Sequence, residues 1–252
     1  MNQQQRREGI IDMVGRQGYT SIEQLADHFA VTPQTIRRDL NQLAKKNRVR
    51  RVHGGASLES STVNTSYSTR KSLNLEAKQR IAAAVARQIP EDASLFINIG
   101  TTNEIIAQAL LEHRSLEVIT NNLNVAAILQ HKEQFKLIIA GGQIRSRDGG
   151  IIGEATIDFI NQFKVDVGII GISGIDEDGS LLEFDYQEAR VAQAIIRNSR
   201  QVFLAADYSK FQRNPVVRQG HLSQISALFT DRNPPDNIRR LLKQQDVALY
   251  LV

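Results

Sequence analysis

Residues 31–43 place arginine, glutamine, asparagine and threonine side chains close together in one short stretch of chain. Arginine can donate two hydrogen bonds to guanine, and glutamine or asparagine can pair in the same two-point way with adenine. Threonine hydroxyls and the N–H groups at a helix start can hold phosphate oxygens. The candidate contacts of this kind are Thr32, Gln34, Thr35, Arg37, Arg38 and Asn41.

The same stretch carries the signals that start a helix and bury its opposite face. Thr32 can cap the helix, and Pro33 suits the first helical position, where its missing N–H group costs nothing. Ile36, Leu40 and Leu43 recur at i, i+4 and i+7, which is the spacing of one buried helix face. The cationic and amide side chains therefore point away from the core, toward a partner.

A second capped helix is predicted just before this one. Ser21 and Gln24 have the form of a capping box, and Ile22 and Leu25 begin an apolar face. Only residues 30–32 separate the two helices. Two capped helices joined by so short a turn predict a helix-turn-helix, whose second helix enters the major groove of DNA.

Elements on either side of this pair complete the predicted first domain, residues 1–57. An earlier helix is expected to end at Gly15 and Gly18, and valines alternate with arginines around a Gly54–Gly55 turn to predict a hairpin wing. A hairpin edge fixes position on phosphates more readily than it reads bases. The wing adds three candidate DNA contacts, namely Arg50, Arg51 and His53. The alternative is a three-helix bundle that binds another protein or nothing.

The charge distribution agrees with a polyanion partner for the first domain alone. Residues 1–56 contain ten Lys and Arg against five Asp and Glu, whereas the remainder contains twenty-one against twenty-two. The whole basic excess, and thus the net charge of +4, therefore lies at the N-terminus.

Composition argues against several other classes of protein. The chain has no cysteine, so disulfides, zinc fingers and thiol chemistry are excluded, and its five histidines show no metal-ligand spacing. No cofactor or metal is expected. No apolar run approaches the length of a membrane span, and the first residues lack a hydrophobic signal segment, so we expect a cytoplasmic protein.

Residues 58–74 are rich in serine and threonine, too polar to build a core, and are predicted to be a linker. Residues 75–252 then alternate apolar runs with helical patterns. This alternation predicts an α/β domain of Rossmann-like form, a mostly parallel sheet with helices on both faces. The predicted strands fall near residues 94–99, 116–119, 136–140, 165–170 and 201–206.

Small and polar residues directly follow these predicted strands. Ligands of open parallel sheets bind at such turns, because glycine lets the backbone approach and the next helix offers free N–H groups. A phosphorylated metabolite fits this chemistry: Lys210 would supply a positive charge, and Asp176 or Asp207 would accept hydrogen bonds from ligand hydroxyls. The candidate effector-binding residues are Gly100, Thr101, Thr102, Thr120, Asn121, Asn122, Gly141, Gly142, Ser173, Gly174, Asp176, Asp207 and Lys210.

The second domain also allows an enzymatic reading. Proton transfer beside a carbonyl, as in a phosphosugar isomerase, needs one positioned carboxylate. Five candidates cluster in the sequence, namely Asp176, Asp178, Glu183, Asp185 and Glu188. Acidic loops are more often simply solvated, so a binding role is favoured.

The order of these parts resembles the DeoR family of bacterial transcriptional repressors, in which a winged helix-turn-helix precedes a sensor related to sugar-phosphate isomerases. The resemblance spans the whole chain and rests on residues 21–43, residues 53–56, the polar turns and residues 78–82. It implies a repressor that is not an enzyme. A homo-oligomer, dimer or tetramer, is expected because operators mirror protein symmetry.

Within this family, several segments are similar to those of members that control glycerol and glycerol-3-phosphate utilisation genes. The resemblance implies that sn-glycerol 3-phosphate releases the protein from operator DNA, with another phosphorylated sugar or polyol as the alternative effector. The segments are residues 63–65, 121–125, 144–155, 171–176 and 178–186.

Overall fold

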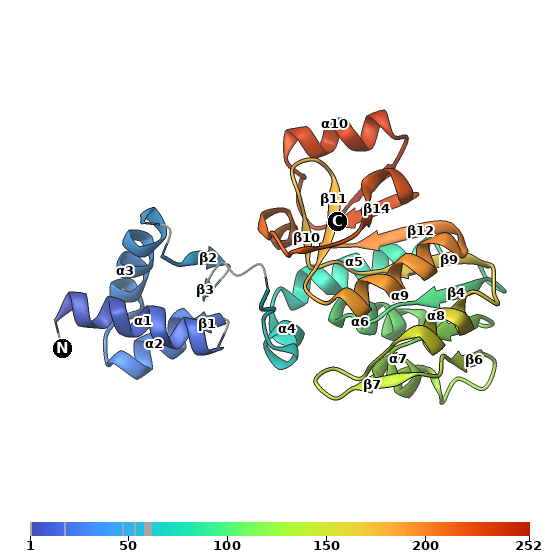
Figure 1. Cartoon of the computed structure of the whole chain (residues 1–252), viewed down its shortest axis with the longest axis horizontal. Coiled ribbons are helices and arrows are strands. Elements are labelled where there is room, and N and C mark those ends of the chain that lie inside the picture. The colour runs from blue at the N-terminus through green and yellow to red at the C-terminus, as the bar shows by residue number, and fades with distance from the viewer. Residues whose placement is uncertain (1, 18, 47, 53, 58–61) are drawn as a thin grey trace. The chain divides into compact units, whose positions relative to one another are not determined.

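The computed structural model describes residues 2–17, 19–46, 48–52, 54–57 and 62–252. Its chain divides into two compact units, Met1–Leu73 and Asn74–Val252, shown in Figure 1. Each unit has its own buried apolar core.

The first unit is a winged helix-turn-helix. A three-stranded antiparallel sheet in the order β1-β3-β2 accompanies the helices. The elements are α1 (Gln3–Gln17), β1 (Tyr19–Ser21), α2 (Ile22–Phe29), α3 (Pro33–Lys45), β2 (Arg50–Val52), β3 (Gly55–Ser57) and α4 (Tyr67–Ser72).

The capping signals read from the sequence are present. Ser21 and Gln24 form the capping box of α2, and the Thr32 hydroxyl accepts the Thr35 amide at 3.2 Å at the start of α3. Ala30 ends α2 in the left-handed conformation, which makes the turn between the helices tight. The predicted helix-turn-helix is confirmed.

Three details of the first unit differ from expectation. Helix α1 ends at Gln17, just before Gly18 in the sequence as expected, but it continues through Gly15, because packing of Ile10 and Val14 in the core outweighs one glycine. Strand β1 is an additional partner for β3 of the wing. The segment expected as a linker contains α4, since the Ser66 hydroxyl accepts the Thr69 amide and caps a helix there.

The second unit is built on a seven-stranded sheet whose strand pairs are all parallel. Its strand order is β15-β14-β12-β9-β4-β5-β6. The strands are β4 (Ser94–Ile97), β5 (Glu117–Thr120), β6 (Lys136–Ile139), β9 (Val165–Ile170), β12 (Ser199–Ala205), β14 (Ala227–Thr230) and β15 (Ala248–Leu251).

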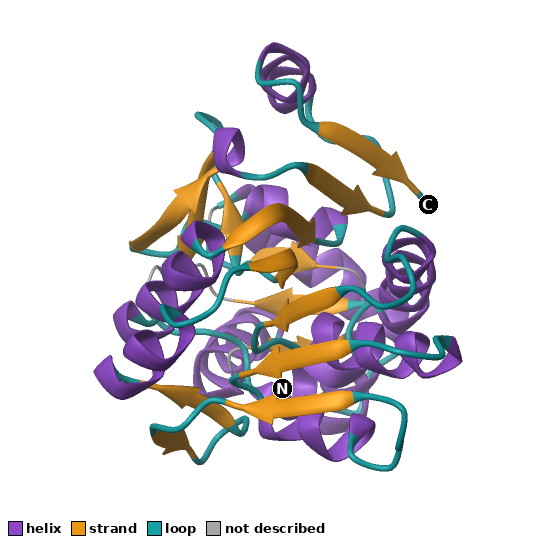
Figure 2. Cartoon of the chain, turned by 90° about the vertical axis from the view of Figure 1, so that its right-hand side faces the viewer, coloured by secondary structure: helices purple, strands orange, loops and turns teal. Residues whose placement is uncertain are grey.

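Helices cover both faces of this sheet, as Figure 2 shows. One face packs against α5 (Leu75–Arg87), α6 (Thr101–Ala109) and α7 (Leu123–Leu129). The other packs against α8 (Glu154–Ile160), α9 (Tyr186–Arg197) and α10 (Asp236–Gln244). The predicted Rossmann-like arrangement is confirmed.

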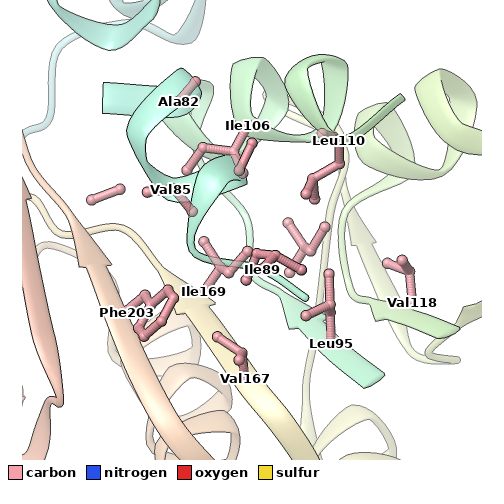
Figure 3. Packing of buried hydrophobic residues seen from close by; sticks show 14 of the residues in the cluster. Ala82, Val85, Ile89, Leu95, Ile106, Leu110, Val118, Val167, Ile169 and Phe203 are labelled. Carbon is pink, nitrogen blue, oxygen red and sulfur yellow. The ribbon is translucent and has the colours of Figure 1, made fainter. Parts of the chain in front are cut away.

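Alternate residues of each strand feed the two cores. Leu95 and Ile97 of β4 lie with α5 and α6, whereas Phe96 faces the other side. Figure 3 shows Val85 of α5 and Ile106 of α6 gathered over the strands. Burial on both faces explains the nearly continuous apolar runs in these strands.

In the second unit, two small antiparallel sheets and three short 3-10 helices lie outside the main sheet. They are β7 (Gln143–Arg145) with β8 (Gly150–Ile152), and β10 (Gly174–Ile175) with β11 (Ser180–Glu183) and β13 (Val217–His221); the 3-10 helices are η1 (Leu110–Glu112), η2 (Tyr208–Gln212) and η3 (Leu222–Gln224). Within the described ranges, no helix has the length and apolar character needed to cross a membrane.

Candidate functional site

Helix α3 presents the predicted reading face to solvent. Gln34, Arg37, Arg38 and Asn41 are all exposed, while Ile36 on the opposite side is completely buried. The Thr32 and Thr35 hydroxyls lie 3.0 Å apart at the start of the helix. The exposed face therefore combines two arginines, two amides and a helix N-terminus, which suits both base edges and phosphates.

The buried carboxylate of Asp39 fixes the orientation of α3. Asp39 is 0% exposed, and it accepts hydrogen bonds from Arg6 Nε at 2.7 Å, Arg7 Nε at 2.8 Å and Gln3 Nε2 at 3.3 Å, all from α1. A buried charge needs such partners, and here they come from a single neighbouring helix. The sequence does carry a signal for this role, because Asp39 lies at the i+3 position of the apolar face that begins with Ile36.

The wing contributes Arg51 next to the reading face. Arg51 is exposed, and its Nη1 donates to Asn41 Oδ1 at 2.6 Å, so the wing and α3 form one continuous polar surface. Arg50 is half-buried in β2. His53, the third predicted wing contact, lies outside the described residues.

The predicted effector turns follow strands that share one sheet edge. Strands β4 and β9 are neighbours, but the chain proceeds outward from β4 to β5 and β6 and outward from β9 in the opposite direction. Such a switch point leaves room for a ligand beyond the carboxyl ends of the strands. Gly100–Thr102 after β4 and the turn at Ser173 after β9 are at this place in the topology.

Helix α6 begins at the switch point without a side-chain cap. Its N-cap Gly100 has φ 140°, a conformation that other residues rarely adopt. Thr101 and Thr102 are buried, and Lys78 Nζ of α5 donates to Thr101 Oγ1 at 3.2 Å. Lys78 is only 3% exposed, so this helix start has positive charge from both the helix dipole and an ammonium group.

Asp207 lies in the same electrostatic environment but is held by the protein. Its Oδ1 accepts from Asn74 Nδ2 at 2.9 Å and from the Ser209 hydroxyl at 2.6 Å. Burial alone would raise the pKa of Asp207, but the charges of Lys210 and Lys78 and the Ser209 hydrogen bonds outweigh burial and lower it. Asp207 thus stays ionised beside Lys210 and Lys78, and its predicted binding of ligand hydroxyls stays a prediction.

Amide side chains near the ends of β4 and β5 have polar atoms without protein partners. Asn121 Nδ2 donates to the Ile151 carbonyl, and Asn122 Oδ1 caps α7. Within the described part of the chain, the buried atoms Asn103 Oδ1, Asn121 Oδ1 and Asn122 Nδ2 have no hydrogen-bond partner. Two acceptors and one donor left unpaired in this way are suited to ligand hydroxyls. Sequence reasoning missed Asn103.

Several of the predicted turn residues have an explanation in packing. Thr120 Oγ1 donates to the Ile97 carbonyl at 2.7 Å, which ties β5 to β4. A Cβ atom at Gly142 would lie 2.1 Å from Thr156 Oγ1, and one at Gly174 would lie 2.2 Å from the Arg213 carbonyl oxygen. These glycines are required by close neighbours, whereas Gly141 is exposed and has open space.

Asp176 makes its hydrogen bonds within a small antiparallel hairpin. It belongs to the turn between β10 and β11, where its Oδ1 accepts the Glu177 amide at 2.8 Å. The neighbouring carbonyls of this turn accept hydrogen bonds from Asn237 of α10 and contact His221. The role of Asp176 in binding an effector stays a prediction.

The carboxylates considered for proton transfer mostly have structural partners. Asp178 accepts the Ser180 amide at 2.8 Å, and this hydrogen bond lowers its pKa. Asp185 caps α9, and Glu188 forms an ion pair with Arg145 at 2.7 Å. Glu183 is buried beside the Phe184 amide. These contacts favour roles in holding loops over a role as a base.

The fold and the exposed polar face of α3 define a DNA-binding regulator with an attached α/β sensor. Two family models match the chain: a DeoR-like helix-turn-helix domain over residues 6–62 and a DeoR C terminal sensor domain over residues 73–232. The chain belongs to the DeoR family.

Full-length relatives agree with this assignment. The glycerol-3-phosphate regulon repressor of Escherichia coli (strain K12) is 57% identical over 251 residues, covering 100% of both chains. The repressor of the same name from Haemophilus influenzae is 51% identical, covering 100% of this chain and 98% of the relative. The HTH-type transcriptional repressor CsqR of Escherichia coli is 38% identical, covering 98% and 94%.

Similarity to solved structures is weak. Ribose 5-phosphate isomerase A from Methanocaldococcus jannaschii matches 55% of each chain at 12% identity with a TM-score of 0.42. This likeness is too distant to support a statement about activity.

Replacing Asp39 with Ala should destabilise the first unit and disturb the reading face. Arg6 and Arg7 lose the carboxylate that they share, at a cost of roughly 1–3 kcal/mol, since both side chains retain some access to water. Chemical denaturation of the full chain, together with operator gel shifts, measures both effects. The exposed Asp27→Ala variant changes the net charge equally and is the control. Equal stabilities of the two variants would show that the ion pairs do not anchor α3.

Replacing Gly142 with Ala should lower the melting temperature, whereas Gly141→Ala should leave it nearly unchanged. The new methyl group at Gly142 meets Thr156 at 2.1 Å in a backbone conformation with φ 150°, and nothing lies within 4 Å of one at Gly141. The expected costs are roughly 1–3 kcal/mol and under about 0.5 kcal/mol respectively. Differential scanning fluorimetry compares the pair, and a stable Gly142→Ala protein would contradict the packing explanation.

Proposed function

We propose that this protein represses genes for glycerol and glycerol-3-phosphate utilisation and leaves its operators when sn-glycerol 3-phosphate binds the second unit. The observation that carries the proposal is full-length similarity to glycerol-3-phosphate regulon repressors, at 57% identity over 251 residues. Both the DNA-contacting face and the polar turns of the sensor lie within the aligned length.

On the DNA side, we assign base reading to α3 and phosphate contacts to the wing. Gln34, Arg37 and Arg38 are exposed on the side of α3 opposite its buried face. Arg51 continues that surface through its hydrogen bond to Asn41. The helix lies in the major groove, and the hairpin edge follows the backbone.

On the effector side, the phosphate is assigned to the start of α6. Uncapped helix N–H groups, the Thr101 and Thr102 hydroxyls and the Lys78 ammonium provide the charge and donors that a phosphate needs. The glycerol hydroxyls then meet Asn103, Asn121 and Asn122, whose unpaired atoms include acceptors and a donor. Asp207 attracts the ammonium groups of Lys78 and Lys210 and so keeps them near this site.

Release requires that the effector prefer one of two states of the protein. We propose a homo-oligomer whose two heads match the spacing of operator half-sites, since paired half-sites mirror protein symmetry. An effector that binds a state with mismatched heads more tightly shifts the population toward that state. The ratio of the effector's affinities for the two states limits how far the population can shift.

The alternative effector is another phosphorylated sugar or polyol, because the phosphate site is general and the amide side chains can read various hydroxyl patterns. Turnover of a phosphosugar is the less favoured function. The carboxylates available for it serve mostly as caps and ion-pair partners.

Replacing Arg38 with Ala should abolish operator binding and leave effector binding intact, because the side chain is exposed in the first unit and the effector site is in the second.

Replacing Arg51 with Ala should weaken binding to all DNA sequences and reduce the salt dependence of binding by about one phosphate contact. Gel shifts at several salt concentrations measure both variants. Normal operator binding by Arg38→Ala would contradict the proposed reading face.

A thermal-shift panel of phosphorylated three- to six-carbon metabolites tests the effector. At a hundredfold excess over Kd, sn-glycerol 3-phosphate should raise the melting temperature of the sensor by roughly 5–10 °C. Lys78→Met should remove most of this shift, whereas Lys136→Met, which changes a side chain 68% exposed on β6, should retain it. A response to a different metabolite alone would reassign the effector.

A further inference from the structure

The β7–β8 hairpin holds the turn after β5 that carries two candidate effector residues. The Ile151 amide donates to the Asn121 carbonyl at 2.7 Å, and Asn121 Nδ2 donates back to the Ile151 carbonyl at 2.9 Å. The Leu123 amide also donates to the Gly149 carbonyl at 3.0 Å. The position of Asn121, and of Asn122 between these contacts, therefore depends on the position of the hairpin.

Arg145 fixes the hairpin turn with both edges of its guanidinium. Its Nε and Nη2 donate to the two carboxylate oxygens of Asp148 at 2.9 and 2.7 Å. Its Nη1 donates to Glu188 at 2.7 Å and to Asp185 at 3.1 Å, both at the start of α9. Only 10% of the side chain is exposed. A planar, two-point contact of this kind fixes geometry as well as charge.

Asn124 of α7 also holds this turn and links it to α6. Asn124 Nδ2 donates to the Asp148 carbonyl at 2.9 Å and to Glu104 Oε1 of α6 at 3.1 Å. Asp148 is thus held through its carboxylate by Arg145 and through its carbonyl by α7. These contacts form a continuous polar connection from α6, where the phosphate is assigned, to α9.

The guanidinium is also needed electrostatically. The Asp148 and Glu188 side chains are 7% and 15% exposed, and both lie 2.7 Å from Arg145. Burial lowers the pKa of Arg145, but Glu188 and Asp148 raise it more, so the side chain remains a cation. Without it, two poorly hydrated carboxylates would face each other, and the turn would shift to separate them.

We propose that Arg145 is a positioning residue for the effector site: it holds the β7–β8 hairpin so that Asn121 and Asn122 meet the hydroxyl groups of the phosphorylated effector. Arg145 acts through the hairpin and does not contact the ligand itself. This inference rests on the proposed function of the turn after β5.

The test compares Arg145→Gln with Arg147→Gln in the full-length protein. Arg147 lies in the same hairpin turn, is 54% exposed and contacts Asp185 at 3.0 Å, so its variant removes the same charge without removing the two-point contact. We expect Arg145→Gln to raise the sn-glycerol 3-phosphate concentration that releases half of the operator by about tenfold. Arg147→Gln should change it less than about twofold. Operator affinity without effector should be unchanged in both, because the DNA head is a separate unit.

Two further readouts separate positioning from loss of folding. Arg145→Lys restores the charge but not the two-point geometry, and its release concentration should fall between wild type and Arg145→Gln. Hydrogen exchange of the effector-free protein should be faster in Arg145→Gln at the amides of Gly149, Ile151 and Leu123, with the rest of the sheet protected as in wild type.

The outcomes distinguish this inference from the proposed function. If wild type is released by sn-glycerol 3-phosphate and Arg145→Gln is released at the same concentration, Arg145 has no positioning role. If Arg145→Gln lost operator affinity, effector response and hydrogen-exchange protection of the sheet together, the positioning role would also be contradicted. Arg145 would then support folding in general. A wild type that sn-glycerol 3-phosphate does not release would contradict the proposed function itself.

Discussion

The parallel direction of the seven sensor strands is the constraint on which the binding chemistry depends. Because every strand pair of the main sheet is parallel, the turns that follow the strands come to the same edge. The neighbouring strands β4 and β9 are buried except at Ser94 and Asp166, which leaves little room for polar side chains within them. Hydroxyls, amides and charges therefore gather at this edge, with Lys78 reaching Thr101 there from α5.

The first unit meets a different physical requirement. A recognition helix must expose many polar groups and still keep a fixed direction, although its apolar face is only a narrow stripe. The ion pairs of Asp39 with Arg6 and Arg7 supply directional contacts that Ile36 and Leu40 alone do not. Aliphatic packing tolerates small rotations, whereas a buried carboxylate with arginine partners allows few.

The sensor contains both side chains that are held by several partners and side chains with unpaired polar atoms. Asp207 and Arg145 are surrounded by partners and hold their neighbours, whereas Asn103, Asn121 and Asn122 keep buried polar atoms unpaired. Unpaired buried groups reduce stability, and a ligand that pairs them regains that free energy on binding. In the proposed function, an effector that pairs these atoms in only one of two states would favour that state, which a regulator needs in order to respond.

The sequence by itself determined the elements whose signals are local. Ser21 and Thr32 mark helix starts through hydrogen bonds only three residues away, and apolar periodicity gives the buried faces, so the helix-turn-helix and the alternating α/β domain could be predicted. Tertiary structure alone decided which distant residues meet. Asp39 finds partners 32 and 33 residues away, and Asp207 meets Asn74 at a separation of 133 residues. Such pairings depend on the order and direction of the strands, and the spacing of residues along the sequence does not reveal either.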